Sequence, residues 1–188
     1  MLKEKFDFLH ISTGDVLREQ KKANTPISQE IEGYIKEGKL VPSKILIDLL
    51  NTVILDPSNR GKIILLDGFP RNFENYEVWK TEMGVVKVEF KFLLFFECSN
   101  QTLENRILER AKSSGRSDDN PEALKKRITT YENETKPILE LFEKEGKVVK
   151  IDAEVGKEEI FESVVKVLGE HGLVEGRKEF KKLDFFYY

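Results

Sequence analysis

Short apolar runs alternate with longer amphipathic segments along this chain, and that alternation narrows the possible fold more than any other feature. The apolar runs at residues 6–11, 63–66, 88–98 and 148–151 are predicted to be strands. The main segments between them carry apolar residues at helical spacing and start near capping residues or prolines. Strands that alternate with helices predict an α/β fold, in which a parallel sheet has helices on both faces.

The chain has 188 residues, which is the length of one domain, and it carries no excess of positive charge. The net charge is -3, so nothing favours nucleic acid as a partner. The single cysteine, Cys98, cannot form an internal disulfide, which suits a reducing compartment. No apolar stretch approaches the roughly 18–20 residues of a membrane span, and the first residues lack the apolar core of a secretory signal. We therefore expect a cytoplasmic protein, with the nucleus as the alternative, and no membrane contact.

Four arginines surround a break in the helical pattern at residues 113–120. Arg106 and Arg110 are four residues apart and so share one helix face. Arg116 lies in the break, and Arg127 belongs to the helical pattern that follows it. Guanidinium groups that converge from two helix ends suit a polyanion, because their planar fork matches phosphate oxygens. The alternative is a solvated charged surface.

A fifth arginine follows the apolar run at residues 63–66. The sequence Asp67-Gly68-Phe69-Pro70 forces a turn and delivers Arg71 at the carboxyl end of the predicted strand. Ligands of open α/β sheets bind at that edge. An ordinary strand-to-helix turn is the alternative, and the arginine cluster counts against it.

Four motifs in this order resemble those of the nucleoside monophosphate kinases, most closely the eukaryotic-type UMP-CMP kinases and next the short-lid adenylate kinases. The motifs are Ser12-Thr13-Gly14-Asp15-Val16-Leu17-Arg18, Glu37-Gly38-Lys39-Leu40-Val41-Pro42, Asp67-Gly68-Phe69-Pro70-Arg71-Asn72 and Ser114-Gly115-Arg116-Ser117-Asp118-Asp119-Asn120. The resemblance runs from about residue 5 to about residue 168. It implies one domain over residues 1–188, with an acceptor-binding insertion at about 13–44, a short zinc-free lid at about 112–121 and a C-terminal extension at about 170–188.

This resemblance implies transfer of the γ-phosphoryl group of ATP to CMP or UMP, which serves nucleotide biosynthesis and needs Mg²⁺. Such transfer depends mainly on positioning and charge neutralisation. By the family pattern, Arg18 and Arg71 would grip the acceptor phosphate. The catalytic set around the transferring group would be Arg110, Arg116, Arg127, Asp118 and Asp119. A helix-capping pair is the alternative role for the two aspartates.

Further roles also follow from the resemblance. Arg106 would lie against the ATP base, with Arg110 beside the ATP phosphates, and Asp67 would hold Mg²⁺ through water. The remaining residues of the acceptor site would be Thr13, Gly38, Lys39, Val41, Gly68, Asn72 and Asn75. Similar adenylate kinases carry Gln where Asn75 stands, so the shorter amide favours a pyrimidine over AMP. AMP as acceptor, and Asn75 as a plain surface residue, are the alternatives.

The sequence departs from the family at its start. Family members begin with a strand and a Gly-x-x-x-x-Gly-Lys loop whose amides cradle the donor phosphates. The match to that spacing here, Gly33 to Lys39, is followed by Val41-Pro42 where a helix should be under way, so we reject it. In the family this strand lies mid-sheet, between the strands predicted at residues 63 and 88. Each unpaired backbone group left there would cost on the order of 1–3 kcal/mol, against a total stability of roughly 5–15 kcal/mol.

Three explanations for this departure stay open. The sequence could be a shortened form of a working kinase, it could repack or borrow a strand from another copy, or it could be a catalytically dead relic that binds nucleotides.

The aromatic end at residues 185–188 suggests a contact with the body or with a partner chain, because large apolar patches normally mark contacts. A frayed terminus is the duller alternative. We expect a monomer, with self-association through the missing-strand gap or the aromatic tail as the alternative.

Overall fold

The computed structural model describes residues 1–37, 39–83, 88–116, 118–174 and 183–187. Five strands form one sheet in the order β1-β2-β5-β3-β4, and every neighbouring pair is parallel. The strands are β1 (Leu9–Ser12), β2 (Ile63–Asp67), β3 (Val88–Glu97), β4 (Val148–Asp152) and β5 (Leu183–Tyr187). The predicted α/β fold with a parallel sheet is therefore confirmed.

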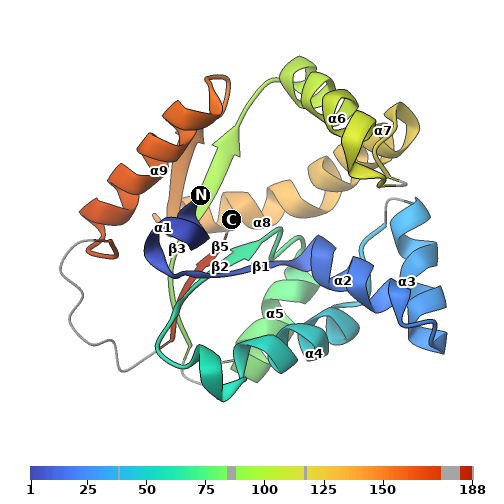
Figure 1. Ribbon diagram of the computed structural model, residues 1–188, viewed down its shortest axis with the longest axis horizontal. Coiled ribbons are helices and arrows are strands. Elements are labelled where there is room, and N and C mark those ends of the chain that lie inside the picture. The colour runs from blue at the N-terminus through green and yellow to red at the C-terminus, as the bar shows by residue number, and fades with distance from the viewer. Residues whose placement is uncertain (38, 84–87, 117, 175–182, 188) are drawn as a thin grey trace.

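Helices connect and cover the strands (Figure 1). They are α1 (Leu2–Phe6), α2 (Thr13–Lys22), α3 (Pro26–Glu37), α4 (Ser43–Ile54), α5 (Phe73–Met83), α6 (Asn100–Ser114), α7 (Pro121–Thr130), α8 (Lys136–Lys144) and α9 (Lys157–Glu170). A 3₁₀ turn spans Pro57–Asn59, and a π-helical turn spans Tyr131–Thr135. None of the helices in the described part of the chain is long and apolar enough to cross a membrane.

The sheet has a hydrophobic core on each face, as the alternation of side chains along a buried strand requires. Ile64 and Leu66 of β2 pack with α2 to α5 and α8, whereas Ile63 and Leu65 pack with α1 and α9. All four side chains are at most 3% exposed. The continuous apolar run that predicted this strand is therefore explained by burial on both faces.

Two local predictions were wrong. The apolar run at residues 6–11 is not one strand, because α1 ends at Phe6 and Asp7 takes a left-handed conformation (φ 54°) before β1 starts at Leu9. From the sequence we also expect one helix over residues 121–145 with a possible kink at Pro137, but the π turn at Tyr131–Thr135 interrupts it, and Pro137 lies in the first turn of α8. Gly33 lies inside α3, so the rejection of Gly33 to Lys39 as a phosphate loop is confirmed.

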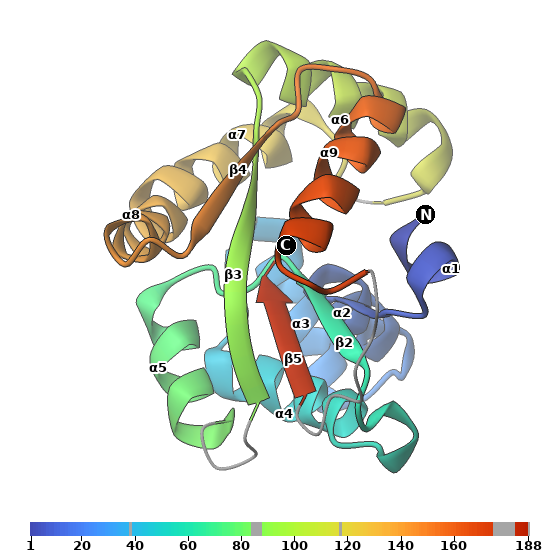
Figure 2. The ribbon, with the colours of Figure 1, turned by 90° about the vertical axis from the view of Figure 1, so that its left-hand side faces the viewer.

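The sequence did not predict β5 as a strand. It lies between β2 and β3, where the family has the strand that this sequence lacks. It pairs with β2 over residues 184–187 and with β3 over residues 183–187. Figure 2 shows it between these two strands and parallel to them. Residues 185–187 of the aromatic end thus belong to the central strand of the sheet of the same chain.

Candidate active site

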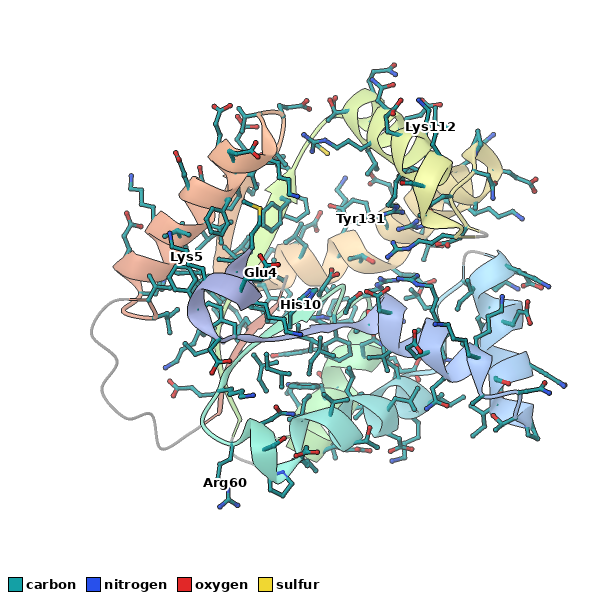
Figure 3. The ribbon with its side chains drawn as sticks, in the orientation of Figure 1. Glu4, Lys5, His10, Arg60, Lys112 and Tyr131 are labelled. Carbon is teal, nitrogen blue, oxygen red and sulfur yellow. The ribbon has the colours of Figure 1, made fainter. Side chains whose placement is uncertain are left out.

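A cavity of about 440 Å³ opens at the carboxyl edge of the sheet, beyond the last residues of β1 and β2. Five arginines from distant parts of the sequence line it: Arg18, Arg71, Arg110, Arg116 and Arg127. Tyr131, another lining residue, is labelled in Figure 3 between α8 and the α6–α7 pair. The structure thus brings together the five arginines that the resemblance assigned to the phosphates. Arg106, which the sequence grouped with three of them, does not line the cavity.

Arg71 is held at the end of β2 by neutral groups. Its Nε donates to the carbonyl oxygen of Gly68 at 2.7 Å, and its backbone N–H donates to Oδ1 of Asn75 at 3.0 Å. Its own carbonyl accepts from Oγ1 of Thr135 at 2.7 Å. Burial, and then the positive charge of Arg127, lower the pKa of Arg71 below its usual value. A pocket that disfavours this charge is one in which a bound anion is stabilising.

Gly68 gives Arg71 the space for this position. Its φ is +73°, in the left-handed region that favours glycine. A Cβ added at Gly68 would lie 2.6 Å from Nη2 of Arg71 and 3.1 Å from Oγ1 of Thr13. The turn after β2 therefore needs glycine both for its backbone conformation and for the approach of the guanidinium group.

The start of α2 forms the neighbouring wall. Thr13 is 1% exposed, and its hydroxyl lies 3.1 Å from the carbonyl oxygen of Asp67 and 3.2 Å from that of Gly68, which ties α2 to the end of β2. Asp15 accepts from Nη2 of Arg18 at 2.5 Å and from Nη2 of Arg116 at 3.2 Å. The hydrogen bond from Arg18 is the main cause of a lowered pKa of Asp15. One carboxylate thus joins an arginine of α2 to an arginine of the break after α6.

Arg110 on α6 is paired with the carboxylate of Asp119. Its Nε and Nη2 donate to the two oxygens at 2.9 and 2.5 Å, and the hydroxyl of Ser114 donates at 2.7 Å. These bonds, with the one from Arg110 the strongest, lower the pKa of Asp119 to about 2. The same pairing raises the pKa of Arg110.

Arg127 on α7 lines the cavity with a partly exposed side chain. Its Nη1 is 3.5 Å from the carboxylate of Asp118, which is a long contact. Burial lowers the pKa of Arg127, and Asp118 only partly opposes that effect. Arg127 therefore resembles Arg71, because desolvation lowers the pKa of both and the neighbouring carboxylates do not fully offset it.

The other predicted residues are distributed in three ways. The cavity lining includes Thr13, Lys39, Val41, Asp67, Gly68, Asn75 and Asp118. Asn72, Arg106 and Asp119 are not among the lining residues: Asn72 donates to Glu134 at 3.1 Å, and Nη2 of Arg106 donates to the carbonyl of Val155 at 3.2 Å. Gly38 lies outside the described residues.

Asn75 has structural partners as well as a place in the lining. It is 2% exposed, its Oδ1 accepts from the N–H of Arg71, and its Nδ2 donates to Oγ of Ser43 at 2.8 Å. The amide therefore joins the first residue of α4 to the turn that carries Arg71. Its predicted role in base choice would have to be exerted from this fixed position.

Sequence reasoning missed Asp15, Ser43 and Thr135. Asp15 had a readable signal, because it precedes Arg18 by three residues on a predicted helix, and residues at that spacing meet. Ser43 and Thr135 contact residues 32 and 64 positions away, so no local pattern identifies them.

Asp67 is suited to hold magnesium through water. It ends β2, lines the cavity, and its side chain is 38% exposed, so water can reach it. Mg²⁺ in nucleotide sites usually takes one or two carboxylates and completes its shell with water and phosphate oxygens. Within the part of the chain that the structure describes, no group of three or more His, Cys, Asp or Glu residues could hold a metal ion.

Comparison with known proteins identifies the family. The family model described as adenylate kinase matches residues 1–147. The chain belongs to this family. The UMP-CMP kinase of Danio rerio is 47% identical over 169 residues, which cover 88% of this chain and 86% of the relative. The UMP-CMP kinases of Homo sapiens and Xenopus tropicalis are 44% and 46% identical, and each match covers 90% of this chain and 88% of the relative.

These matches confirm the resemblance drawn from the four motifs. As a member of the adenylate kinase family, the protein is a nucleoside monophosphate kinase. Its similarity to UMP-CMP kinases extends well beyond the motifs, over nine tenths of the chain.

Proposed function

We propose that this nucleoside monophosphate kinase transfers the γ-phosphoryl group of ATP to a pyrimidine monophosphate, CMP or UMP, and releases ADP and the diphosphate. The observation that carries the proposal is the single cavity lined by five arginines. Two nucleotides that exchange a phosphoryl group bring several negative charges to one place, and catalysis then consists largely of positioning and neutralising them.

The two ends of the cavity suit different tasks. Arg18 and Arg71 belong to the α2 and β2 side, and we assign them to the phosphate of the acceptor. Arg110, Arg116 and Arg127 belong to α6, α7 and the break between them, and we assign them to the transferring phosphoryl group. Asp118 and Asp119 hold Arg127 and Arg110 by charged contacts, so we assign them to orienting those arginines. Arg106, outside the lining, is the candidate for the ATP base.

Magnesium would enter with ATP. When bound, it neutralises phosphate charge and holds the phosphate oxygens in place. Asp67 is the residue that would keep it at the end of β2 through water. The chain's own part is to fix Asp67 and Arg71, which Thr13 and Gly68 do by closing the β2 turn against α2.

The preference for a pyrimidine rests on similarity to UMP-CMP kinases and on Asn75. Lys39 and Val41 also line the cavity, and we assign their backbone to contacts with the base or the ribose. AMP is the competing acceptor, because the matching family model is described as adenylate kinase.

A coupled assay of ADP formation tests the proposal, with ATP, Mg²⁺ and either CMP, UMP or AMP. We expect turnover with CMP or UMP and at least about tenfold lower kcat/KM with AMP. Arg116→Ala should lower kcat by about 10³-fold or more, as the loss of an arginine at a transferring phosphate does. Arg60→Ala is the matched control, because Arg60 is exposed, does not line the cavity, and lies at the bottom of Figure 3, away from the lining residue Tyr131.

Each alternative has its own result. Faster turnover with AMP than with CMP or UMP would assign the chain to adenylate transfer. Binding of the monophosphates without transfer from ATP would make it a nucleotide-binding relic. Equal losses in Arg116→Ala and Arg60→Ala would contradict the role given to the cavity.

A further inference from the structure

The strand β5 is the backbone connection between two halves of the sheet. One edge of β5 pairs with β2, with Phe185 opposite Ile64, and the other edge pairs with β3, with Phe185 opposite Phe90. The strand order places β1 and β2 on one side of β5 and places β3 and β4 on the other. Among the described strands, β5 is the one that both halves share.

The same two halves carry the two ends of the arginine cavity. Strands β1 and β2 lead directly into the residues around Arg18 and Arg71. Strand β3 leads into α6, which carries Arg110 and ends just before Arg116. Adjacent strands lie about 4.8 Å apart, so a strand between β2 and β3 sets their separation at roughly twice that value. The width of the cavity therefore depends on what occupies the position of β5.

Other contacts between the two halves involve side chains, and one group of them lies around α8. Phe142 packs against Tyr76 of α5 and against Phe90 of β3, with ring centroids 5.2 Å apart in both pairs. Thr135 donates to the carbonyl of Arg71. On the other face, Ile63 and Leu65 of β2 belong to one hydrophobic cluster with Phe92 of β3. Contacts of this kind leave the backbone edges of β2 and β3 to be paired by a strand.

We propose that β5 is a self-complementing strand: the slot between β2 and β3 takes the chain's own C-terminal segment as a parallel strand, and the arginine cavity keeps its shape only while the slot is filled. Strand addition of this kind binds by main-chain hydrogen bonds along both edges. The consequence for activity rests on the proposed kinase function, whereas the placement of the strand does not.

Cysteine crosslinking tests the placement and the register directly. Glu89 is opposite Asp184 across β3 and β5. In a Cys98→Ser background, Glu89→Cys combined with Asp184→Cys should form a disulfide within one chain on mild oxidation, read as a monomer on non-reducing gels. The control pair Glu89→Cys and Asp152→Cys should not crosslink, because Asp152 is opposite Glu97 at the other end of β3. A disulfide-linked dimer would show that the segment of a second copy fills the slot. The absence of any disulfide would show that β5 does not lie there. Either result overturns the proposal.

A matched pair at Phe185 tests what the strand does. Phe185→Pro removes an N–H that a central strand uses for pairing, whereas Phe185→Val keeps it and suits a strand. We expect Phe185→Pro to lower Tm by about 10 °C or more and to weaken CMP binding at least about tenfold, with much smaller changes in Phe185→Val. Arg116→Ala, in contrast, should lower turnover at nearly unchanged Tm. Equal behaviour of the Pro and Val variants would overturn the proposal.

Adding the strand as a peptide provides the rescue experiment. A synthetic peptide of residues 176–188, added to the full-length Phe185→Pro protein, should raise its Tm and restore CMP binding in a saturable manner. The same peptide with Pro at position 185 should do neither. If the Pro variant does not fold in isolation, the crosslinking result still decides where β5 lies.

Discussion

Arg71 and Arg110 line the same cavity, yet they are stabilised in opposite ways. Arg71 contacts neutral groups, the carbonyl of Gly68 and the side chains of Asn75 and Thr135, and its pKa is lowered by burial and by Arg127. Arg110 faces the carboxylate of Asp119 through two hydrogen bonds, and its pKa is raised. The first guanidinium group is thus positioned without being neutralised, and the second is positioned by being neutralised.

This difference indicates how the two ends of the cavity respond to a phosphate. At Arg71 itself, a bound phosphate supplies negative charge that the hydrogen-bond partners of Arg71 do not supply, so binding should relieve the unfavourable burial of the cation. At the Arg110 end, a phosphate must share the cation with Asp119. Substitutions near Arg71, which is held by neutral groups, should therefore have different effects from substitutions near Arg110, which is paired with Asp119.

Among the substitutions that compare the two ends, the largest effect is expected where Arg71 is displaced. Gly68→Ala would place a methyl group 2.6 Å from Nη2 of Arg71 in a backbone conformation that alanine disfavours. We expect kcat/KM to fall about 100-fold, because small displacements of positioning groups have effects of that size, and stability to fall by about 1–3 kcal/mol. Steady-state kinetics and urea unfolding provide the two measurements.

Gly33→Ala is the matched control for this substitution. Gly33 lies in α3, and a Cβ added there meets nothing within 4 Å. Alanine favours a helix over glycine by up to about 1 kcal/mol, so this variant should be as active as the parent and slightly more stable. A Gly68→Ala enzyme with normal kinetics would show that Arg71 is not held in place by the turn.

The paired end should show its dependence on charge through pH. The carboxyl of Asp119 has a pKa of about 2, below the ordinary value of 3.8, so its stabilising effect is complete above about pH 4 and is lost as the pH falls through 2. The difference of nearly two pH units corresponds to about 2 kcal/mol. Asp119→Asn should therefore unfold more easily by about that amount at pH 7, and its stability should approach that of the parent near pH 2.

Chemical unfolding of both proteins between pH 7 and pH 2 measures this convergence. Asp48→Asn is the control, because Asp48 pairs with Lys44 on the exposed side of α4 and such pairs contribute about 0–1 kcal/mol. If the gap between Asp119→Asn and the parent stays constant over the whole pH range, the Arg110 end is not stabilised by charge, and its contrast with the Arg71 end disappears.

The sequence predicted the sheet and the arginines well, because both rest on local patterns. The run at residues 63–66 is apolar since β2 is buried on both faces, and the turn that follows had to place Arg71 at the sheet edge. The sequence could not predict β5, because its pairing depends on residues that are far apart in the chain. Its pairing joins residues 184–187 to strands about 90 to 120 positions earlier, and its aromatic residues predict a contact without predicting the partner.

We assigned no role to Asp15 from the sequence, although its spacing from Arg18 indicated one. Substitution of Asp15 should have the smallest effect of those considered. The carboxylate accepts from Arg18 and from Arg116, but its side chain is 57% exposed, so water and salt weaken both contacts. We expect Asp15→Asn to change stability by less than about 1 kcal/mol and to change KM for the acceptor by no more than about fivefold.

A double-mutant cycle between Asp15→Asn and Arg116→Ala, measured by urea unfolding, isolates the contact between these two residues. The coupling should be at most about 1 kcal/mol in dilute buffer and should shrink in roughly 0.5 M salt, as expected for an exposed ion pair. A coupling above about 2 kcal/mol that ignores salt would instead mean a buried, rigid contact. Asp15 would then fix Arg116 as firmly as Gly68 fixes Arg71, and the two ends of the cavity would no longer differ in how readily their arginines are released to a phosphate.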